Sequence, residues 1–140
     1  MLYTMFGAGL GLLLVDQASK WLIASRRLPE WRLCGCSLRI RAVENRAPDY
    51  QRRGPRLVLL AIWFAVMSYA TWLQFSGPFF QHNAALIGLG LALGGAAGNL
   101  ADILRRHCVT DLFAVGRWPV FNLADVGIVT GLILAGVWHD

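Results

Sequence analysis

Two aspartates are the best candidates for chemistry in this chain. Asp111 lies in the apolar segment CVTDLFAVG, and RWPVFN then leads back to the apolar run that holds Asp125. We therefore expect the two carboxyl groups to meet near the boundary of an apolar layer. Two carboxylates that close cannot both ionise easily, so one stays protonated. Such a pair can hydrolyse a peptide, because the ionised Asp takes a proton from water while the protonated one polarises the scissile carbonyl.

The tetrapeptide Asn-Leu-Ala-Asp occurs twice, beginning at Asn99 and at Asn122. In a helix, an Asn and an Asp three residues apart share one face. The first copy predicts a polar support near the end of a helix, where Arg106 lies four residues after Asp102 and is available as an ion partner. The second copy opens the last apolar segment and carries Asp125.

A further charged pair lies inside the first apolar segment. Asp16 and Lys20 are four residues apart, so they can form an ion pair on one helix face. Charged groups in apolar spans are costly and often functional. The pattern leaves two readings open, a structural pair that holds helices in register and a direct catalytic role.

Other catalytic schemes fit the sequence poorly. Ser does not occur in a nucleophile elbow, and GLGLALGG lies in an apolar segment rather than between a strand and a helix. Cys34, Cys36 and Cys108 have no His partners at the spacing of a zinc site. We expect no metal site.

The composition indicates a protein that meets lipid. Hydrophobic residues make up 56% of the chain and charged residues only 15%, against about 25% in soluble domains. Four apolar stretches, at residues 2–24, 57–75, 84–104 and 120–138, approach or exceed the ~20 residues that span a bilayer. The sequence predicts one domain over residues 1–140, an all-α integral membrane fold of four transmembrane helices, the first retained rather than cleaved. Gly90, Gly94 and Gly98 predict a close-packing helix face.

The connections between these stretches differ. Residues 76–83 form a short turn and residues 107–119 a short mixed loop, whereas residues 25–56 contain an alternating SLRIRAVEN that predicts one or two short strands. Nine of the twelve Arg lie in this long connection. Because they fill gaps between apolar segments, they favour anionic lipid headgroups over nucleic acid as partners. The charge rule alone would place the Arg-rich loops in the cytoplasm.

The segments VDQASK, GGAAGNLAD, VTDLF and WPVFNLAD, in this order, resemble the motifs of the lipoprotein signal peptidase (signal peptidase II) family over the whole chain. The resemblance implies a multi-pass aspartic endopeptidase of the bacterial plasma membrane, without metal or cofactor. It would cleave prolipoproteins before the diacylglyceryl-modified Cys. Asp111 and Asp125 match the family's catalytic aspartates. The supporting or substrate-binding positions fall on Asn122, Asn99, Asp102, Asp16, Lys20 and Asn45. Of these, we expect Asn122 and Asn99 to orient the two aspartates by hydrogen bonds.

Two motifs depart from the family pattern. Arg46 directly follows Asn45, without the family's Gly and Ala-Phe pair, and Ile103 stands where the family has Arg. These changes keep three alternatives open: a paralogue with another substrate, a non-catalytic binder of lipoprotein or lipid, and a scaffold. The family also places both larger loops, with their small β element, and the catalytic pair on the extracytoplasmic side. We follow it there, and expect a monomer whose partners are prolipoprotein and membrane phospholipid.

Overall fold

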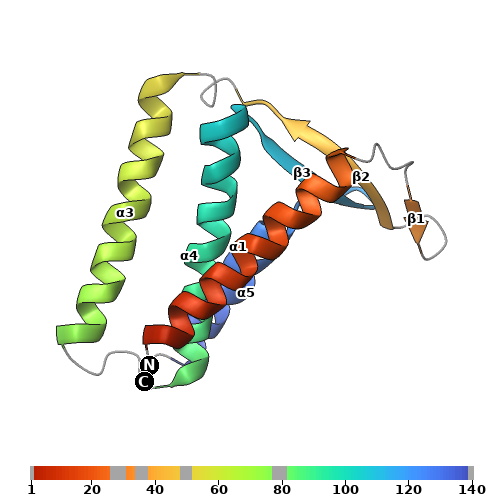
Figure 1. Cartoon of the computed structure of the whole chain (residues 1–140). Coiled ribbons are helices and arrows are strands. Elements are labelled where there is room, and N and C mark those ends of the chain that lie inside the picture. The colour runs from red at the N-terminus through yellow and green to blue at the C-terminus, as the bar shows by residue number, and fades with distance from the viewer. Residues whose placement is uncertain (1, 26–30, 34–37, 48–51, 77–81, 139–140) are drawn as a thin grey trace.

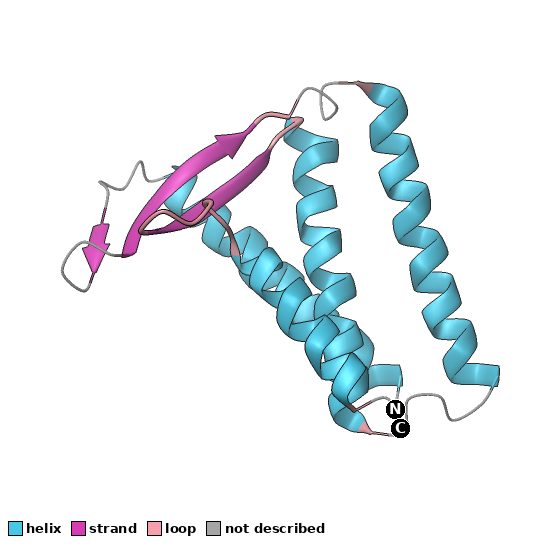
Figure 2. Ribbon diagram, turned by 180° about the vertical axis from the view of Figure 1, so that it is seen from behind, coloured by secondary structure: helices cyan, strands magenta, loops and turns pink. Residues whose placement is uncertain are grey.

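The computed structural model describes residues 2–25, 31–33, 38–47, 52–76 and 82–138. Helices run side by side from one end of the molecule to the other, with a small sheet at one end and both chain termini at the opposite end (Figure 1). The view from behind shows the same separation of sheet and termini (Figure 2). In chain order the elements are α1 (Leu2–Ser25), β1 (Trp31–Leu33), β2 (Leu38–Asn45), α3 (Arg53–Ser76), α4 (Asn83–Arg106), β3 (Val109–Val115) and α5 (Leu123–Val137).

Helix α4 is the centre of the bundle, because glycines let α1 and α5 approach its backbone. A Cβ built on Gly90 would lie 2.1 Å from the Met5 carbonyl oxygen, and one on Gly94 would lie 2.2 Å from that of Gly9. No side chain fits at either position. The helix face predicted from the glycine spacing is therefore the α1–α4 contact, as small residues at helix interfaces allow.

Helix α3 packs much more loosely than its neighbours. Ala70 is its only buried residue, and most of its large apolar side chains are exposed. One polar contact ties it to the centre, where Trp63 Nε1 donates to the Leu93 carbonyl oxygen of α4 at 3.0 Å. The helix thus leaves room for a groove along α4.

Helix α5 begins later than predicted. Residues 120–122 precede it, and Phe121 forms a bridge with Phe113 of β3 instead of a helical turn. Asn122 is the N-cap, with an extended backbone, and its side chain accepts from the Asp125 backbone N–H while Asp125 accepts from the Asn122 backbone N–H. This reciprocal cap explains why the helix starts at Leu123, since it satisfies two N–H groups that lack helical partners.

The sheet draws on two separate connections. Its strands are antiparallel in the order β1-β2-β3. Strands β1 and β2 form the β element that was predicted within residues 25–56. The prediction of a loop over residues 107–119 is wrong, because Val109–Val115 pairs with β2, with Val43 opposite Asp111. Tertiary pairing fixes this segment, because VTDLFAV lacks the alternation of apolar and polar residues that marks a strand in the sequence.

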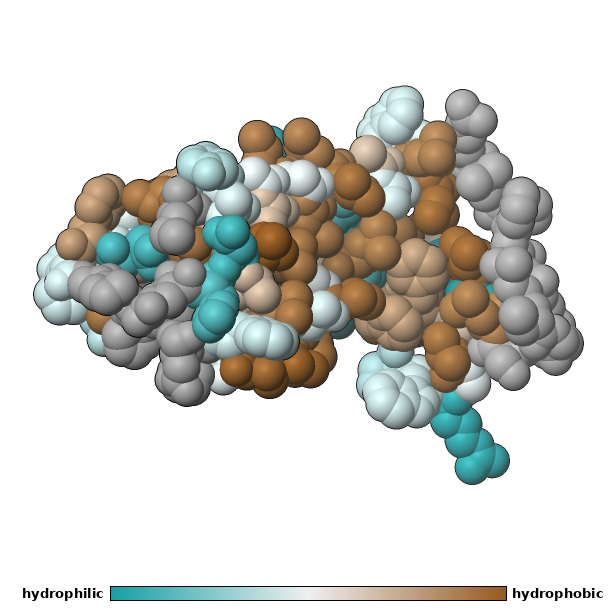
Figure 3. Space-filling view, turned by 90° about the horizontal axis from the view of Figure 1, so that it is seen from below, coloured by the Kyte–Doolittle hydropathy of each residue, from teal (hydrophilic) through white to brown (hydrophobic). Residues whose placement is uncertain are grey.

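The exterior of the helices is strongly apolar. Large side chains such as Leu10, Trp21, Phe64 and Leu132 are exposed, and apolar residues are prominent on the face that Figure 3 shows. Helices α3 and α4 are long and apolar enough to cross a membrane, and α5 is apolar but shorter, with 15 residues. Helix α1 has 24 residues, like α3 and α4, with Asp16 and Lys20 buried inside it. The predicted apolar helical fold is present, and its number of membrane spans is taken up below.

Gly94→Val tests the close contact of α1 with α4. The new side chain would meet the Gly9 backbone, so we expect a loss of roughly 1–3 kcal/mol in unfolding free energy. The measurement is thermal or denaturant unfolding in detergent, followed by circular dichroism. Gly11→Val is the matched control, because nothing lies within 4 Å of a Cβ built there. Equal destabilisation of both variants would contradict this packing.

Candidate active site

The polar residues singled out in the sequence converge where the helices meet the sheet. They come from α1, from α4, from β3 and from the start of α5, and most are fully buried. Those with side chains at most 6% exposed are Asp16, Lys20, Asp102, Asp111 and Asn122. Residues far apart in the chain thus form one polar cluster inside an apolar bundle.

Lys20 is the hub of this cluster. Its Nζ lies 2.7 Å from Asp16 Oδ2 and 2.9 Å from Asp102 Oδ2. It also donates to Asn99 Oδ1 at 3.2 Å. The ion pair expected between Asp16 and Lys20 is present. Because all three side chains are at most 1% exposed, these ion pairs offset the cost of removing each charge from water.

The partner expected for Asp102 is different. Asp102 faces the core and pairs with Lys20, whereas the exposed Arg106 donates to Thr110 Oγ1 at 3.4 Å. Spacing along α4 brought Arg106 within reach, but the burial of Asp102 directs its carboxylate inward. The Asp102 carboxylate also accepts from the backbone N–H of Thr110 at 3.4 Å, which links α4 to β3.

Asp16 connects α1 to the start of α5. Its Oδ1 accepts from the Ala124 backbone N–H at 3.0 Å, one of the N–H groups that a helix start leaves unpaired. Gly98 makes room for it, since a Cβ there would lie 2.8 Å from Asp16 Oδ2. The first helix therefore supports the segment that carries Asp125.

Gln17 is a member of the cluster that sequence reasoning missed. Its Nε2 donates to the Gly98 carbonyl oxygen at 3.1 Å and to Asp102 Oδ1 at 3.3 Å. The signal was available, because Gln17 is a polar residue inside an apolar segment and adjoins Asp16. Adjacent residues on a helix point in different directions, so only the packing against α4 shows that Asp16 and Gln17 both reach this cluster.

Asn122 bridges the two candidate catalytic aspartates. Its Nδ2 donates to Asp111 Oδ1 at 2.9 Å, and its backbone N–H donates to Asp125 Oδ2 at 3.1 Å. The other oxygen of Asp125 accepts from Asn99 Nδ2 at 2.8 Å. The hydrogen bonds expected from Asn99 and Asn122 are therefore present, and together they hold both carboxyl groups in place.

Burial makes Asp111 a weaker acid than an ordinary aspartate. Loss of hydration, and after it the nearby charge of Asp125, raise its pKa from 3.8 to about 6. The hydrogen bond from Asn122 and the charge of Lys20 act in the opposite direction. Asp111 therefore exchanges its proton in the weakly acidic range, as a member of an acid and base pair requires.

Asn45 lies away from this cluster. It is the exposed last residue of β2, opposite Val109, whereas the neighbour of Asp111 across the sheet is Val43. Among the described residues, no hydrogen bond joins Asn45 to the two aspartates. Arg46 beyond it forms an exposed ion pair with Glu44. Within the described part of the chain, no group of three His, Cys, Asp or Glu side chains could hold a metal ion.

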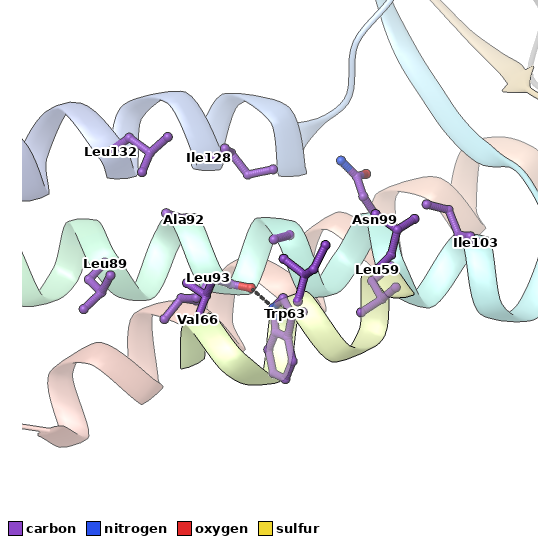
Figure 4. A pocket seen from close by; sticks show the side chains of 13 residues that line it. Leu59, Trp63, Val66, Leu89, Ala92, Leu93, Asn99, Ile103, Ile128 and Leu132 are labelled. Carbon is purple, nitrogen blue, oxygen red and sulfur yellow. Dashed lines mark hydrogen bonds between the residues drawn. The ribbon is translucent and has the colours of Figure 1, made fainter. Parts of the chain in front are cut away.

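Two apolar cavities flank the aspartates. One, of about 410 Å³, runs between α3, α4 and α5, and Asn99 lies near one end of it (Figure 4). The other, of about 370 Å³, lies beside α5 and is lined by Asp125 together with the exposed Trp118. The polar cluster can thus be approached from apolar grooves, as a lipid-linked or hydrophobic ligand requires.

Comparison with known proteins identifies the family of this arrangement. The family model described as signal peptidase (SPase) II matches residues 9–139. The chain belongs to the signal peptidase II family. It is 32% identical over 127 residues to a lipoprotein signal peptidase of Moorella thermoacetica, across 87% of this chain and 83% of that protein.

Other relatives in the family match a shorter stretch. A lipoprotein signal peptidase of Pelotomaculum thermopropionicum is 62% identical over 47 residues, and one of Rhodococcus jostii is 54% identical over 55 residues. These matches cover 34% of this chain and only 31% and 27% of the two relatives. The chain therefore aligns with about a third or less of the length of these two proteins.

Solved structures share the fold. Two structures, each described as a bacterial membrane enzyme, superpose with TM-scores of 0.79 and 0.80. Both are 20% identical to this chain. The superposition covers 96% of this chain and 85% and 90% of the two solved chains. At this identity the likeness shows that the helical bundle with its end sheet is a known architecture.

Asp111→Asn tests the unfavourable burial of this carboxyl group. Because the pKa rises from 3.8 unfolded to about 6 folded, the folded state binds the proton more tightly, and wild-type stability falls as pH rises through this window. Asn keeps the oxygen that accepts from Asn122 but has no charge. We expect the variant to melt higher than wild type above pH 6, by roughly a few degrees.

The measurement is a series of thermal melts at pH values on both sides of this window. The advantage of Asp111→Asn should shrink as the pH falls through this window and vanish below 3.8, where the carboxyl group becomes protonated in both states. Glu44→Gln, an exposed position on the same sheet, should show no such trend. A difference that stays constant with pH would contradict the raised pKa.

Lys20→Met tests the hub of the cluster. Removing the ammonium leaves Asp16 and Asp102 buried without a cation, so unfolding should become easier by about 3–5 kcal/mol. Neutralising a carboxylate as well, in Lys20→Met with Asp102→Asn, should recover part of this loss. Denaturant unfolding in detergent gives both values. Arg46→Met removes the exposed ion pair instead, and a comparable loss there would contradict the special role of burial.

Proposed function

We propose that this protein is a membrane aspartic endopeptidase that removes the signal peptide from lipid-modified bacterial prolipoproteins, before the diacylglyceryl-modified Cys. Membership of the signal peptidase II family supports this activity, and the named relatives are lipoprotein signal peptidases. The observation that carries the catalytic assignment is the bridge formed by Asn122, which binds Asp111 through its side chain and Asp125 through its backbone.

The hydrogen bonds suit different roles for the two aspartates. Asp125 accepts from Asn99 Nδ2 and from the Asn122 backbone N–H, and two N–H donors stabilise a carboxylate. Asp111 accepts one side-chain N–H, and burial raises its pKa to about 6. We therefore assign Asp125 as the base and Asp111 as the acid. In this assignment, the Asp111 oxygen that Asn122 does not contact holds the proton.

Hydrolysis then follows with a balanced transfer of protons. Asp125 takes a proton from a water molecule as the water oxygen bonds to the scissile carbonyl carbon. Asp111 gives its proton to the carbonyl oxygen, which stabilises the tetrahedral intermediate. The intermediate collapses with cleavage of the C–N bond, and the amine leaves with the proton that Asp125 took. The new acid and the free amine are the products, and Asp111 regains its proton from the intermediate's hydroxyl group.

The same proposal places the chain in the bacterial plasma membrane as a multi-pass protein. Helices α1, α3, α4 and α5 form four spans, and the sheet with the two aspartates lies near the extracytoplasmic face. The buried Asp16–Lys20 pair makes α1 tolerable in lipid, since the pair is hidden from the surroundings. The monomer acts on prolipoprotein and contacts phospholipid through its Arg-rich end. A non-catalytic binder is less well supported, because both carboxyl groups are held in place.

Asp111→Asn and Asp125→Asn provide the direct test. Each change removes one proton carrier, so each should lower cleavage of a diacylglyceryl-modified prolipoprotein by at least about a hundredfold. The assay follows the released signal peptide from purified protein in detergent or bilayers. Glu44→Gln is the matched control, since Glu44 is an exposed acid on the neighbouring strand. Cleavage that persists in either Asn variant would overturn the catalytic assignment.

A further inference from the structure

On both α3 and α4, an arginine lies about one helical turn beyond the residues that line the apolar groove between α3, α4 and α5. On α3, Leu59, Trp63 and Val66 line the groove, and Arg56 precedes Leu59 by three residues on the same helix face. On α4, Ile103 lines the groove, and Arg106 follows it by three residues. The two groove-facing stripes therefore both continue into an arginine at the same end of the molecule.

These arginines belong to a larger group, which we call the basic rim. The rim joins the start of α3 to the end of α4, which lie near each other at the sheet end of the bundle (Figure 1). Arg56 is half-buried and held in place, because its Nε donates to the Arg52 carbonyl oxygen at 3.0 Å and its guanidinium contacts His107 Nδ1 at 2.5 Å. The other members are exposed. The rim consists of Arg52, Arg53, Arg56, Arg105 and Arg106.

The groove beneath the rim is built for hydrocarbon. Its lining residues are apolar except Asn99 and Trp63, and they include no acidic side chain. The indole N–H of Trp63 donates to the Leu93 carbonyl oxygen, so the rest of the ring offers only apolar surface to the groove (Figure 4). The groove therefore offers chain-like apolar space below a concentrated positive charge.

We propose that this groove and the basic rim form a binding site for an anionic phospholipid. The phosphate of the headgroup binds the guanidinium groups of the rim, which suit phosphate oxygens in geometry and charge. An acyl chain lies in the groove along Trp63 and Val66. Because a diacylglyceryl group is uncharged, the lipid modification of a prolipoprotein does not account for the rim.

This site would affect the neighbouring aspartates. The groove reaches Asn99, which hydrogen-bonds Asp125, so a bound lipid fills apolar space beside the catalytic pair. An arriving lipid-modified substrate has to share or displace it. This inference rests on the membrane placement given under the proposed function, but not on catalysis, and it can be tested on the Asp125→Asn variant.

The test reconstitutes Asp125→Asn protein in phosphatidylcholine bilayers that contain brominated phosphatidylglycerol or, separately, brominated phosphatidylcholine. Bromine on the acyl chain quenches a tryptophan that it touches. The signal of Trp63 is the difference between this protein and the same protein with Trp63→Phe. We expect brominated phosphatidylglycerol to quench Trp63 at a lower mole fraction than brominated phosphatidylcholine. Equal quenching by the two lipids would overturn the proposal.

Variants of the rim locate the preference. Arg56→Gln with Arg106→Gln should remove the preference for brominated phosphatidylglycerol. Each arginine should account for a roughly fivefold change in relative affinity, which corresponds to about 1 kcal/mol per basic side chain at an anionic surface. Arg56→Lys with Arg106→Lys keeps the charges and should keep most of the preference. Arg41→Gln with Arg117→Gln, at exposed positions away from the groove, is the matched control and should change nothing.

The outcomes separate this inference from the proposed function. A preference that survives Arg56→Gln with Arg106→Gln, or that falls in the control variant, would overturn the site. Absence of quenching by either lipid would overturn the membrane placement of the groove as well. If the Gln variant does not fold by circular dichroism, the comparison of the two lipids on the parent protein and on the Lys variant still decides. Loss of prolipoprotein cleavage has no part in these results.

Discussion

A single buried ammonium group holds the functional end of this molecule together. Lys20 neutralises Asp16 from its own helix and Asp102 from α4, and it also binds Asn99. Each of these three groups passes the effect on: Asp16 binds the start of α5, Asp102 binds the backbone of β3, and Asn99 binds Asp125. The positions of Asp111 and Asp125 therefore depend on Lys20, although neither of them forms a direct bond with Lys20 in this network. Such a cluster is stable only while every buried charge keeps its partner, since removing one partner costs far more folding free energy than the intact pair contributes.

Local patterns were sufficient to predict the features that depend on neighbours along the chain. The apolar runs gave the helices to within a few residues, the spacing of Asp16 and Lys20 gave their ion pair, and the repeat of Gly90 and Gly94 gave the packing face. Each of these follows from helical geometry alone. They account for the bundle and for one contact inside the site.

Contacts between distant segments could not be predicted in the same way. Asp102 had Arg106 within reach on its own helix, but its true partner comes from α1, because only packing decides which face of α4 is buried. Strand β3 could not be predicted either, because VTDLFAV becomes a strand only through its pairing with β2. The repeated tetrapeptide shows the same limit. Asn99 lies inside a helix, whereas Asn122 is an extended cap whose backbone and side chain bind different aspartates.

The shortness of α5 has a consequence for the lipid around it. Fifteen residues give a helix of only about 22 Å, whereas the hydrocarbon core of a bilayer is about 30 Å thick. In the proposed membrane setting, local thinning of the bilayer is one way to relieve this mismatch. Thinning on the side of α5 draws the headgroup layer down towards Asp125 at its first turn. Water and the polar backbone of a substrate would then reach the aspartates at the bilayer surface, and neither would have to enter the hydrocarbon core.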